Sequence, residues 1–369
     1  MKINITHVIS GLDKGGAETM LFKLLNNINL DKYNITVISL TGKGFYGEKI
    51  ENLGIPVFTL DLQKKLLFPF EIFRAYKITK KADLIQSWMY HADLFSVFLA
   101  KFFRKKVLFW GIRHNNTDFK ENKFTTVLIV KINKMLSKIP NKIISCSENG
   151  MREHINIGYN ANNFLVIPNG FYLPDLNAFN KSEKNMLDPK ITKIIHVGRW
   201  NKLKDYSNLL SSLKYVMDKG YSFELTLCGK DIDSNNTELL KMIESNKLSD
   251  RVKLLGRRND VLHLMQSSDV LVSSSSGEGF SNVIGEAMAC ETPCIVTDVG
   301  DSSYIVNNEE YTVPPKDYVS LGNAIINFIN KSSYEVKNDG KLARQRVLEK
   351  FEISKVVEDF EKLYDNYNV

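Results

Sequence analysis

The chain is poor in cysteine and has no long apolar run. Its 369 residues include only four cysteines, Cys146, Cys228, Cys290 and Cys294. They lie within apolar segments and lack metal-ligand spacing, so we interpret them as buried, reduced thiols, a pattern typical of cytoplasmic proteins. No segment reaches the roughly 18 consecutive apolar residues of a membrane-spanning helix. Residues 1–9 have the pattern of a short strand and lack the features of a secretory signal.

Two widespread phosphate-binding motifs are also missing. The glycine pair Gly15-Gly16 follows an apolar run, but neither G-x-G-x-x-G nor the G-K-[ST] of a P-loop is present. Because the first motif marks dinucleotide-binding domains, its absence disfavours a Rossmann dehydrogenase. Helix-turn-helix and paired RNA-binding aromatic motifs are absent as well, so nucleic acid is not an expected partner.

The two halves of the chain differ in charge. Residues 1–180 hold 24 Lys+Arg and 14 Asp+Glu, a net charge of +10, and the rest hold 25 and 28, a net charge of −3, which together give +7. The basic residues cluster with apolar ones at 63–70, 101–106 and 120–142. This composition favours peripheral contact with an anionic membrane, although solvated, lysine-rich helix faces would give any one cluster the same appearance.

The pattern of apolar runs predicts an α/β protein of two domains. Short strand-like runs alternate with amphipathic helical patterns in both halves, which favours parallel sheets covered by helices on both faces. We predict a Rossmann-like domain at 1–175, a linker at 176–190, a second Rossmann-like domain at 191–345, and a terminal helix at 346–369 that packs back toward the first domain. The linker is predicted there because residues 174–189 are polar, with prolines at both ends.

The segment 273–298 is the most informative part of the sequence. It runs from a Ser/Gly-rich turn through a short helical pattern to an apolar strand, and it holds two carboxylates, Glu278 and Glu286. A helix that begins in such a turn directs free N–H groups and its positive dipole end to one spot, which suits a phosphate. Carboxylates accept hydrogen bonds from hydroxyl groups. The combination predicts a nucleotide sugar as ligand.

Three further clusters follow predicted strands. They are the Gly15-Gly16 turn, the Asn169-Gly170 turn, and the loop that carries Arg199 and Lys204. In open α/β sheets, ligands bind beyond the carboxyl ends of the strands, so with two such domains we expect the site in the cleft between them. Arg199 and Lys204 could neutralise a diphosphate as its bond to a sugar breaks. Taken singly, these clusters are also compatible with a tight turn or a surface charge pair.

Together the motifs resemble a known enzyme family. Gly15-Gly16-Ala17-Glu18, Ile167-Pro168-Asn169-Gly170, Gly198-Arg199 with Lys204, Gly256-Arg257 and the element from Glu278-Gly279-Phe280 to Glu286 follow the order found in retaining glycosyltransferases with the GT-B fold, group 1 (family four). The resemblance covers nearly the whole chain. It implies two Rossmann-like domains with an inter-domain active-site cleft, in which 1–175 would bind the acceptor and 191–345 the nucleotide sugar.

The resemblance implies a role for each matching residue. Arg199 and Lys204 would hold the donor diphosphate, and Glu278 would contact the hydroxyls of the transferred sugar. Glu286 would bind the ribose hydroxyls, and Arg257 would frame the base, usually uracil. The implied donor-binding residues are Gly16, Asn169, Arg257, Gly279, Phe280, Ser281, Asn282, Val283 and Glu286. Family members usually need no metal, which agrees with the lack of an Asp-x-Asp triplet, so we expect no metal and no cofactor beyond the nucleotide sugar.

The resemblance also implies a histidine of the first domain near the reacting carbon. His91 follows the predicted strand 84–87 and matches this place best. His114 is the second candidate, and the sequence does not decide between them. His196 and the three remaining histidines lie on strand or helix patterns, where a structural role is more common.

We therefore predict a retaining glycosyltransferase that moves a sugar from a nucleotide sugar, most often UDP-linked in this family, to a saccharide acceptor. By the same resemblance and the basic first half, the acceptor would be lipid-linked, in bacterial surface polysaccharide biosynthesis, and the enzyme would lie on the inner face of the cell membrane. Two alternatives stay open: a sugar-nucleotide epimerase or phosphorylase on the same fold, and a non-catalytic module that binds nucleotide sugars. The sequence does not name the sugar, the acceptor, the linkage or the oligomeric state.

Overall fold

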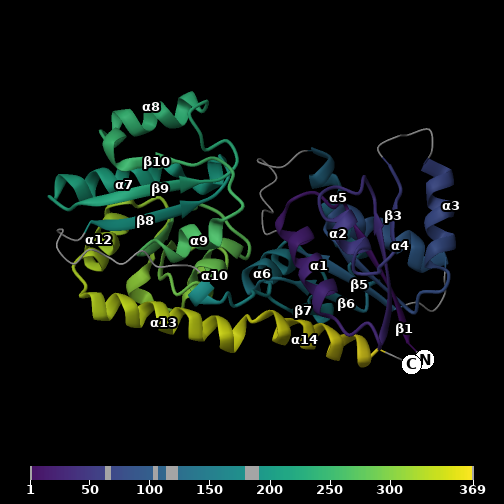
Figure 1. Cartoon of the computed structure of the whole chain (residues 1–369). Helices are drawn as coiled ribbons and strands as arrows, with labels where there is room; N and C mark the ends of the chain where they lie inside the picture. The colour runs from purple at the N-terminus through teal and green to yellow at the C-terminus, as the bar shows by residue number, and fades with distance from the viewer. Residues whose placement is uncertain (1, 63–67, 103–106, 114–123, 179–190, 368–369) are drawn as a thin grey trace. The chain divides into compact units, whose positions relative to one another are not determined.

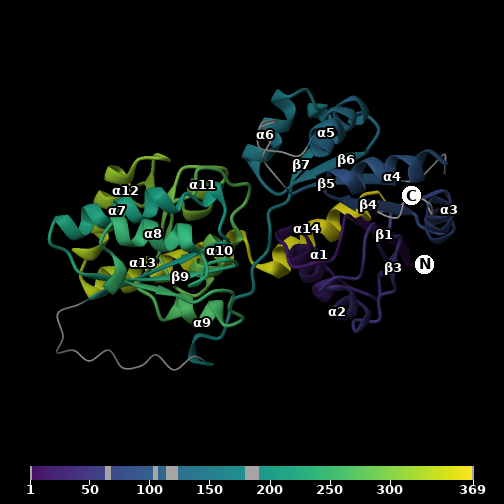
Figure 2. The same ribbon diagram turned by 90° about the horizontal axis from the view of Figure 1, so that it is seen from above.

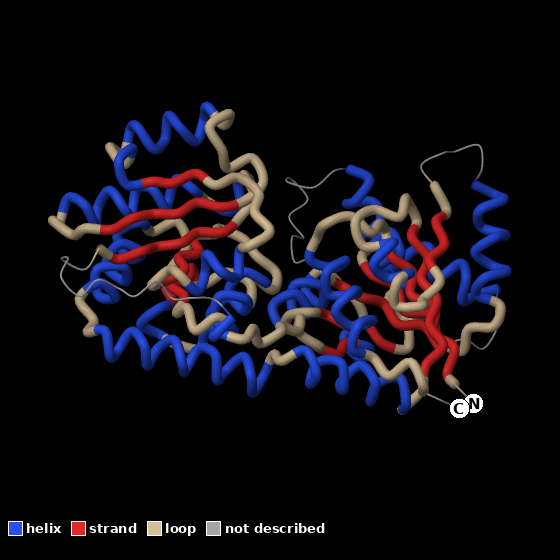
Figure 3. The backbone as a smooth tube through the Cα atoms, in the orientation of Figure 1, coloured by secondary structure: helices blue, strands red, loops and turns tan. Residues whose placement is uncertain are grey.

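The computed structural model describes residues 2–62, 68–102, 107–113, 124–178 and 191–367. The chain forms two compact units (Figure 1), one made of Met1–Gly170 with Ile353–Val369 and the other of Phe171–Glu352. Each unit is built around a parallel sheet with helices packed against it (Figure 3), which confirms the prediction of two Rossmann-like domains.

The first unit contains a seven-stranded sheet in the order β3-β2-β1-β4-β5-β6-β7, in which all paired neighbours run parallel. The order reverses between β1 and β4, the position at which open α/β sheets form their ligand crevice. The strands are β1 (Ile3–Ile9), β2 (Tyr33–Ser39), β3 (Val57–Thr59), β4 (Leu84–Trp88), β5 (Val107–Ile112), β6 (Lys142–Ser145) and β7 (Phe164–Val166).

Two apolar clusters cover the two faces of this sheet. Side chains alternate across a strand, so Ile5 and Ile9 of β1 belong to one cluster and Val8 to the other. The first cluster includes α1 and α14, and the second includes α3, α4 and α5 (Figure 2). The helices of this unit are α1 (Gly16–Asn27), α2 (Gly47–Glu51), α3 (Phe68–Thr79), α4 (Tyr90–Phe102), α5 (Phe124–Leu136), α6 (Glu148–Asn156) and α14 (Ile353–Asp365).

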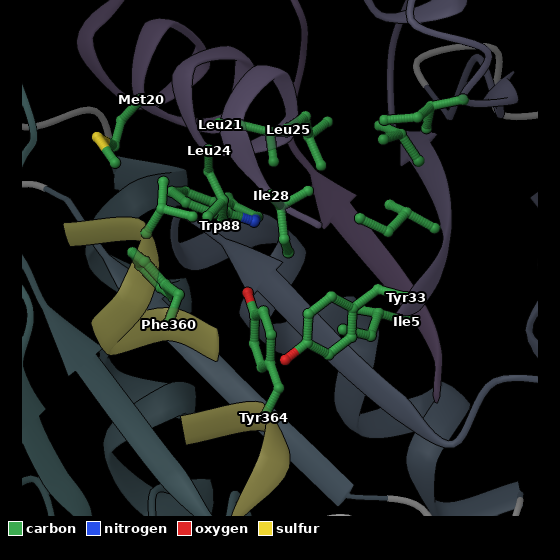
Figure 4. Packing of buried hydrophobic residues seen from close by; sticks show 14 of the residues in the cluster. Ile5, Met20, Leu21, Leu24, Leu25, Ile28, Tyr33, Trp88, Phe360 and Tyr364 are labelled. Atoms are coloured by element: carbon green, nitrogen blue, oxygen red, sulfur yellow. The ribbon is translucent and has the colours of Figure 1, made fainter. Parts of the chain in front are cut away.

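Helix α14 joins the first unit although it lies at the end of the chain. Its apolar residues recur at helical spacing, so Phe360 and Tyr364 point at the sheet beside Trp88 (Figure 4). The Tyr364 hydroxyl donates a hydrogen bond to Gln86 Oε1 over 2.6 Å inside this core. The paired polar group avoids the cost of an unsatisfied buried hydroxyl.

The second unit repeats the same strand order on a smaller scale. Its six parallel strands run β10-β9-β8-β11-β12-β13. They are β8 (Thr192–Val197), β9 (Phe223–Cys228), β10 (Val252–Leu254), β11 (Val270–Ser273), β12 (Cys294–Thr297) and β13 (Thr312–Val313). The helices are α7 (Tyr206–Asp218), α8 (Thr237–Ser245), α9 (Val261–Gln266), α10 (Asn282–Ala289), α11 (Ser302–Val306), α12 (Tyr318–Ile329) and α13 (Ser333–Lys350).

The chain passes between the units twice, at Gly170–Phe171 and at Glu352–Ile353. The two passages lie side by side, because the Phe171 N–H donates to Phe351 O over 2.8 Å and Phe171 pairs with Glu352 in a parallel bridge. The linker was predicted at 176–190, but residues 176–178 form a short 3-10 turn of the second unit, and 179–190 lie outside the described residues. The segment 346–369 likewise divides between the end of α13 and α14.

Asp93 is a buried acid in the core of the first unit. Its Oδ1 accepts hydrogen bonds from Ser87 Oγ (2.6 Å) and the Gly111 N–H (3.3 Å), while its Oδ2 is buried without a partner. Burial raises the pKa of Asp93 to about 8, more than the two hydrogen bonds lower it. The side chain therefore holds a proton at neutral pH in the folded protein and loses it on unfolding.

We expect Asp93→Asn to gain stability over the parent protein as pH rises. The unfolded carboxyl titrates near pH 4 and the folded one near pH 8, so the parent loses about 1.4 kcal/mol per pH unit between those values through this group. The amide does not titrate. Melting temperatures of both proteins at pH 5, 6.5 and 8 check this. Asp31→Asn, at an exposed acid of the same unit, should follow the parent, and a pH-independent difference for Asp93→Asn would contradict the assignment.

Candidate functional site

The loop after β11 carries Glu278 and is held by the loop after β8. Ser274 Oγ donates to Lys204 O over 2.9 Å, and the Ser276 N–H donates to Leu203 O over 2.8 Å. On its other side, Thr297 Oγ1 of β12 donates to Ser275 O over 2.6 Å. The serine run therefore ties the carboxyl ends of three neighbouring strands together.

Lys204 and Glu278 form an ion pair at this edge. Lys204 Nζ lies 2.5 Å from Glu278 Oε1, and the two side chains are only 19% and 14% exposed. Ser275 Oγ donates to the same oxygen over 2.7 Å. An ammonium has three donors and a carboxylate has two acceptor oxygens. Within the part of the chain that the structure describes, the other donors of Lys204 and the Glu278 Oε2 atom have no partner, so both groups can bind a ligand without separating.

Gly300 lets a third loop support this pair. It has a φ of +58°, and a Cβ there would lie 2.4 Å from both Glu278 O and Gly279 O. The next residue, Asp301, donates its N–H to Gly279 O over 3.0 Å. Only glycine combines the left-handed backbone with so close an approach.

The residues from Gly279 to Glu286 divide between backbone and side-chain roles. Ser281 caps α10 without a side-chain hydrogen bond to its first turn, which leaves amides of that turn for a ligand. The Phe280 side chain packs inward, stacked on Phe171 with ring centroids 6.1 Å apart and edge-on to Phe351 at 5.7 Å. Phe280 can therefore contact a donor only through its backbone. Asn282, Val283 and Glu286 are partly exposed on the first two turns of α10.

The two predicted site arginines, Arg199 and Arg257, are exposed. Arg199 lies two residues after β8, and Arg257 lies three residues after β10. Their loops are linked through the loop after β9, because the Gly229 N–H donates to Gly256 O over 2.8 Å and the Trp200 N–H donates to Lys230 O over 2.9 Å. Neither arginine has a hydrogen-bond or ion-pair partner among the described residues, in contrast to Arg258, which pairs with Asp260 at 2.7 Å. Both guanidinium groups remain available to an anion.

His196 lies at the candidate site, although its position in a strand pattern had indicated a structural role. Its Nδ1 donates to Val272 O over 2.9 Å, so Nε2 carries the lone pair, and this nitrogen is buried without a partner. Nε2 lies 3.4 Å from the Cβ position of Gly198, which the Lys204 side chain also approaches, at 3.2 Å. Burial, with a smaller contribution from Lys204, lowers the pKa of His196 to about 4, so the ring is neutral. The position of His196 two residues before Gly-Arg at a strand end is the signal that could have found it.

In the first unit, Gly15 caps α1 and Gly16 is its exposed first residue. Glu18 folds back over this turn, with Oε2 only 2.3 Å from the Cβ position of Gly15. Burial raises the pKa of Glu18, its own backbone N–H lowers it, and the charge of Asp13 adds to the rise. The Glu18 carboxyl group therefore lies at the Gly15-Gly16 turn, which was predicted to bind the donor. The sequence pattern did not indicate this contact.

His91 and Asn169 lie at other strand ends of the first unit. His91 is exposed in the first turn of α4, after Met89, whose φ of +76° forms the tight turn from β4. Partial desolvation by neighbouring atoms lowers the pKa of His91, although the residue as a whole is exposed. Asn169 is 6% exposed, and its Oδ1 accepts a hydrogen bond from Arg113 Nη1 over 2.9 Å. His114 lies outside the described residues, so the choice between the two histidines stays open.

The structure thus gathers the predicted residues in two groups. Lys204, Glu278 and the start of α10 form one group at the carboxyl edge of the second sheet, with Arg199 and Arg257 on neighbouring loops. Gly16, His91 and Asn169 follow β1, β4 and β7 at the same edge of the first sheet. No group of three His, Cys, Asp or Glu side chains in the described ranges could hold a metal ion. The expectation that no metal is needed stays a prediction.

Two Rossmann-like units in tandem define the architecture of GT-B enzymes, and comparisons with known proteins agree. The family described as Glycosyltransferase Family 4 matches residues 14–173, and the family described as Glycosyl transferases group 1 matches residues 177–345. The chain belongs to the GT-B glycosyltransferases, as its motifs predicted.

Individual relatives cover the whole chain or half of it. The capsular polysaccharide biosynthesis glycosyltransferase CapH of Staphylococcus aureus is 22% identical over 378 residues, 98% of each chain. The UDP-Gal:alpha-D-GlcNAc-diphosphoundecaprenol alpha-1,3-galactosyltransferase of Escherichia coli is 27% identical over 212 residues, 54% of this chain and 53% of that one. The crystal structure of Anabaena HepE in complex with UDP is similar with a TM-score of 0.83 at 21% identity, covering 99% of this chain and 100% of that chain.

We expect Gly300→Ala to loosen the Glu278 loop. The added methyl would carry the left-handed backbone penalty of about 1–2 kcal/mol and would also collide with two carbonyl oxygens of the loop. Gly220→Ala is the matched control, because Gly220 has a φ of +87° and nothing within 4 Å of its Cβ position. Hydrogen exchange of peptides covering 274–289 should lose protection only in Gly300→Ala. Equal protection in both variants would show that the loop does not depend on this contact.

Proposed function

We propose that the protein transfers a sugar from a UDP-sugar to a saccharide acceptor with retention of the anomeric configuration. The observation that carries the proposal is the Lys204–Glu278 ion pair, which sets a free ammonium donor beside a free carboxylate oxygen at the start of α10. These groups match the two ends of a nucleotide sugar, a diphosphate and a hydroxyl-rich ring. The similarity to HepE, whose structures contain UDP and UDP-glucose, supports the choice of uridine.

In the proposed mechanism the second unit binds the donor. Lys204 and Arg199 contact the diphosphate, amides of Gly279–Val283 contact phosphate and sugar, and Glu278 Oε2 accepts hydrogen bonds from sugar hydroxyls. Glu286 binds the ribose, and Arg257 lies against the base. Asn169, whose Oδ1 accepts a hydrogen bond from Arg113 Nη1, contacts the donor from the first unit.

The chemical step is a front-face displacement. The bond from the sugar C1 to the phosphate oxygen breaks, and its electron pair leaves with the nucleoside diphosphate. The acceptor oxygen bonds to C1 on the same face, and its proton passes to the departing phosphate. Lys204 and Arg199 stabilise the growing negative charge, and such preorganised donors supply much of the catalysis in comparable sites. In the first unit, Gly16 lies beside the diphosphate and the acceptor, and His91 lies near the reacting carbon.

We further propose an acceptor linked to a lipid, in the assembly of a bacterial surface polysaccharide, at the inner face of the cell membrane. Relatives from Escherichia coli and Campylobacter jejuni are named for transfer to diphosphoundecaprenol-linked sugars, and CapH for capsule biosynthesis. Within the described residues no helix is long and apolar enough to cross a membrane. Contact with lipid would therefore be peripheral.

The outer surface of α3, α4 and α5 supports such contact. Six large apolar side chains are exposed there: Phe70, Phe73, Phe98, Phe124, Leu128 and Met135. The two acids in these helices do not oppose an anionic surface, because Asp93 is buried and Glu71 is paired with Arg74 at 3.6 Å. On α5, the exposed Lys131 lies between Leu128 and Met135 on the same helix face as Phe124. Apolar groups interleaved with lysines suit an anionic bilayer.

Variants of the ion pair test the transferase. We expect Lys204→Met to lower kcat with the preferred UDP-sugar on the order of 10²–10³-fold, because one preorganised cation is lost. Glu278→Gln keeps the shape but weakens both the ion pair and sugar binding. Lys253→Met is the matched control, since it removes the lysine of an exposed Lys–Glu pair (Lys253–Glu224, 2.9 Å) in the same unit. Melting temperatures and the neutral double variant Lys204→Met/Glu278→Gln separate lost folding from lost catalysis.

The donor assay itself decides the reaction class. Thermal shift and product analysis with UDP-, GDP- and ADP-sugars should show stabilisation by UDP-sugars and acceptor-dependent release of UDP. Stabilisation by none of them would overturn the central claim. Altered sugar without acceptor would indicate an epimerase, and donor binding without any turnover would indicate a binding module.

Flotation with vesicles tests the membrane face. We expect the protein to bind phosphatidylglycerol vesicles, less at high salt, and not to bind pure phosphatidylcholine. The double variant Phe124→Ser/Met135→Ser should lower binding about tenfold or more, since two large apolar side chains no longer enter the interface. Tyr334→Ser removes an aromatic side chain that is 80% exposed on α13 of the other unit and should bind like the parent. Equal loss in both variants, or no binding at all, would contradict the assignment.

A further inference from the structure

An exposed phenylalanine lies against two lysines beside the Gly15-Gly16 turn. The Phe45 side chain is 40% exposed. Lys14 Nζ lies 4.2 Å from the centre of its ring, and Lys49 Nζ lies 4.3 Å from it. Lys14 comes from the loop after β1 and Lys49 from α2, so the arrangement joins the carboxyl ends of β1 and β2.

The loop that carries Phe45 is firmly placed. Its neighbour Gly44 has a φ of +51°, and a Cβ there would lie 2.3–2.5 Å from backbone atoms of Leu12 and Asp13. The Tyr46 N–H donates to Leu12 O over 2.8 Å. The Tyr46 hydroxyl lies 2.8 Å from Thr19 Oγ1 of α1. The exposure of Phe45 is therefore set by the fold on both sides of the residue.

The two ammonium groups have no counter-ion among the described residues. Neither Lys14 nor Lys49 forms an ion pair with any residue that the structure describes, whereas Lys43 in the same loop is paired with Glu51 at 2.7 Å. A phenyl ring attracts a cation weakly at an exposed site and leaves its charge in place. The two ammonium groups carry like charges beside one ring, so they repel each other. An anion bound to both of them removes that repulsion.

We propose that Lys14, Phe45 and Lys49 form a subsite for an acceptor that carries a phosphate next to its sugar ring. The two ammonium groups bind the phosphate, and the exposed ring covers the apolar face of the sugar. The proposal rests on the transferase function proposed above, and it adds the chemical class of the acceptor and three residues that recognise it. A free sugar phosphate and a lipid-linked sugar diphosphate share this chemistry.

Binding of matched ligands tests the subsite. With UDP saturating the donor site, glucose 1-phosphate, galactose 1-phosphate and N-acetylglucosamine 1-phosphate are titrated calorimetrically against the methyl glycosides of the same sugars. We expect at least tenfold tighter binding of the phosphates, weakening with added salt. The double variant Lys14→Met/Lys49→Met should lose this preference. Phe45→Leu should weaken phosphates and glycosides alike.

Controls separate the subsite from the fold and from the donor site. Lys43→Met removes a paired lysine of the same loop and should keep the preference for phosphates. The affinity for UDP should be unchanged in every variant. No preference for phosphates in the parent, or equal loss in Lys43→Met, would overturn the proposal. If the parent protein fails to bind UDP, that result counts against the transferase function. The sugar 1-phosphates and methyl glycosides are then titrated without UDP, so the subsite is still tested.

A second experiment decides whether the phosphate belongs to a free sugar phosphate or to a lipid-linked sugar diphosphate. Decyl diphosphate esters of the same sugars are compared with the sugar 1-phosphates. Binding at least tenfold tighter for the esters, lost in the double lysine variant, indicates a lipid-linked acceptor. Equal binding indicates a free sugar phosphate.

Discussion

The contact between Lys204 and Glu278 is the interaction on which the candidate site depends. A largely desolvated ion pair stabilises a protein only when its geometry is well held, because removing both charges from water costs several kcal/mol. Here the geometry is held by backbone and serine hydrogen bonds from Ser274 and Ser276 to residues 203 and 204, and by the close approach of Gly300. The neutral His196 below the pair adds no further charge. The loops after β8, β11 and β12 are therefore held together by direct contacts. A ligand that binds to one of these loops would lie beside the other two.

The aromatic residue Phe171 connects this structure to the passage between the units. It is the first residue of the second unit, it stacks on Phe280 in the Glu278 loop, and it fills the space left by Gly285 of α10, where a Cβ would lie 2.2 Å from its ring. Its N–H is bonded to Phe351 O at the second passage. The Phe171 ring therefore joins the two passages to the Glu278 loop through direct contacts.

Much of the fold and part of the site could be predicted from the sequence. The alternation of apolar runs predicted two parallel sheets, because a βαβ rhythm leaves few other arrangements. The motifs identified Lys204 and Glu278 as candidate site residues. Their direct pairing could not be predicted, because the two residues are 74 positions apart in the sequence. The passage at Gly170–Phe171 was placed too late, because a polar, proline-bounded stretch looks like a linker, whereas Phe171 is buried by Phe351 from a distant part of the chain. The inward turn of Phe280 also depends on tertiary neighbours that no local pattern shows, since its ring packs on Phe171 and Phe351.

The two units hold their cations in opposite ways, and this difference has a physical consequence. In the second unit Lys204 is neutralised by a carboxylate, so in the proposed mechanism the pair would orient a ligand more than attract one, and its remaining donors would act where charge develops. In the first unit Lys14 and Lys49 rest on Phe45, which leaves their charges uncompensated. Uncompensated cations contribute to affinity over a longer range and are weakened by salt. Binding at the first unit should therefore respond more strongly to ionic strength than binding at the second, although both would recognise phosphate.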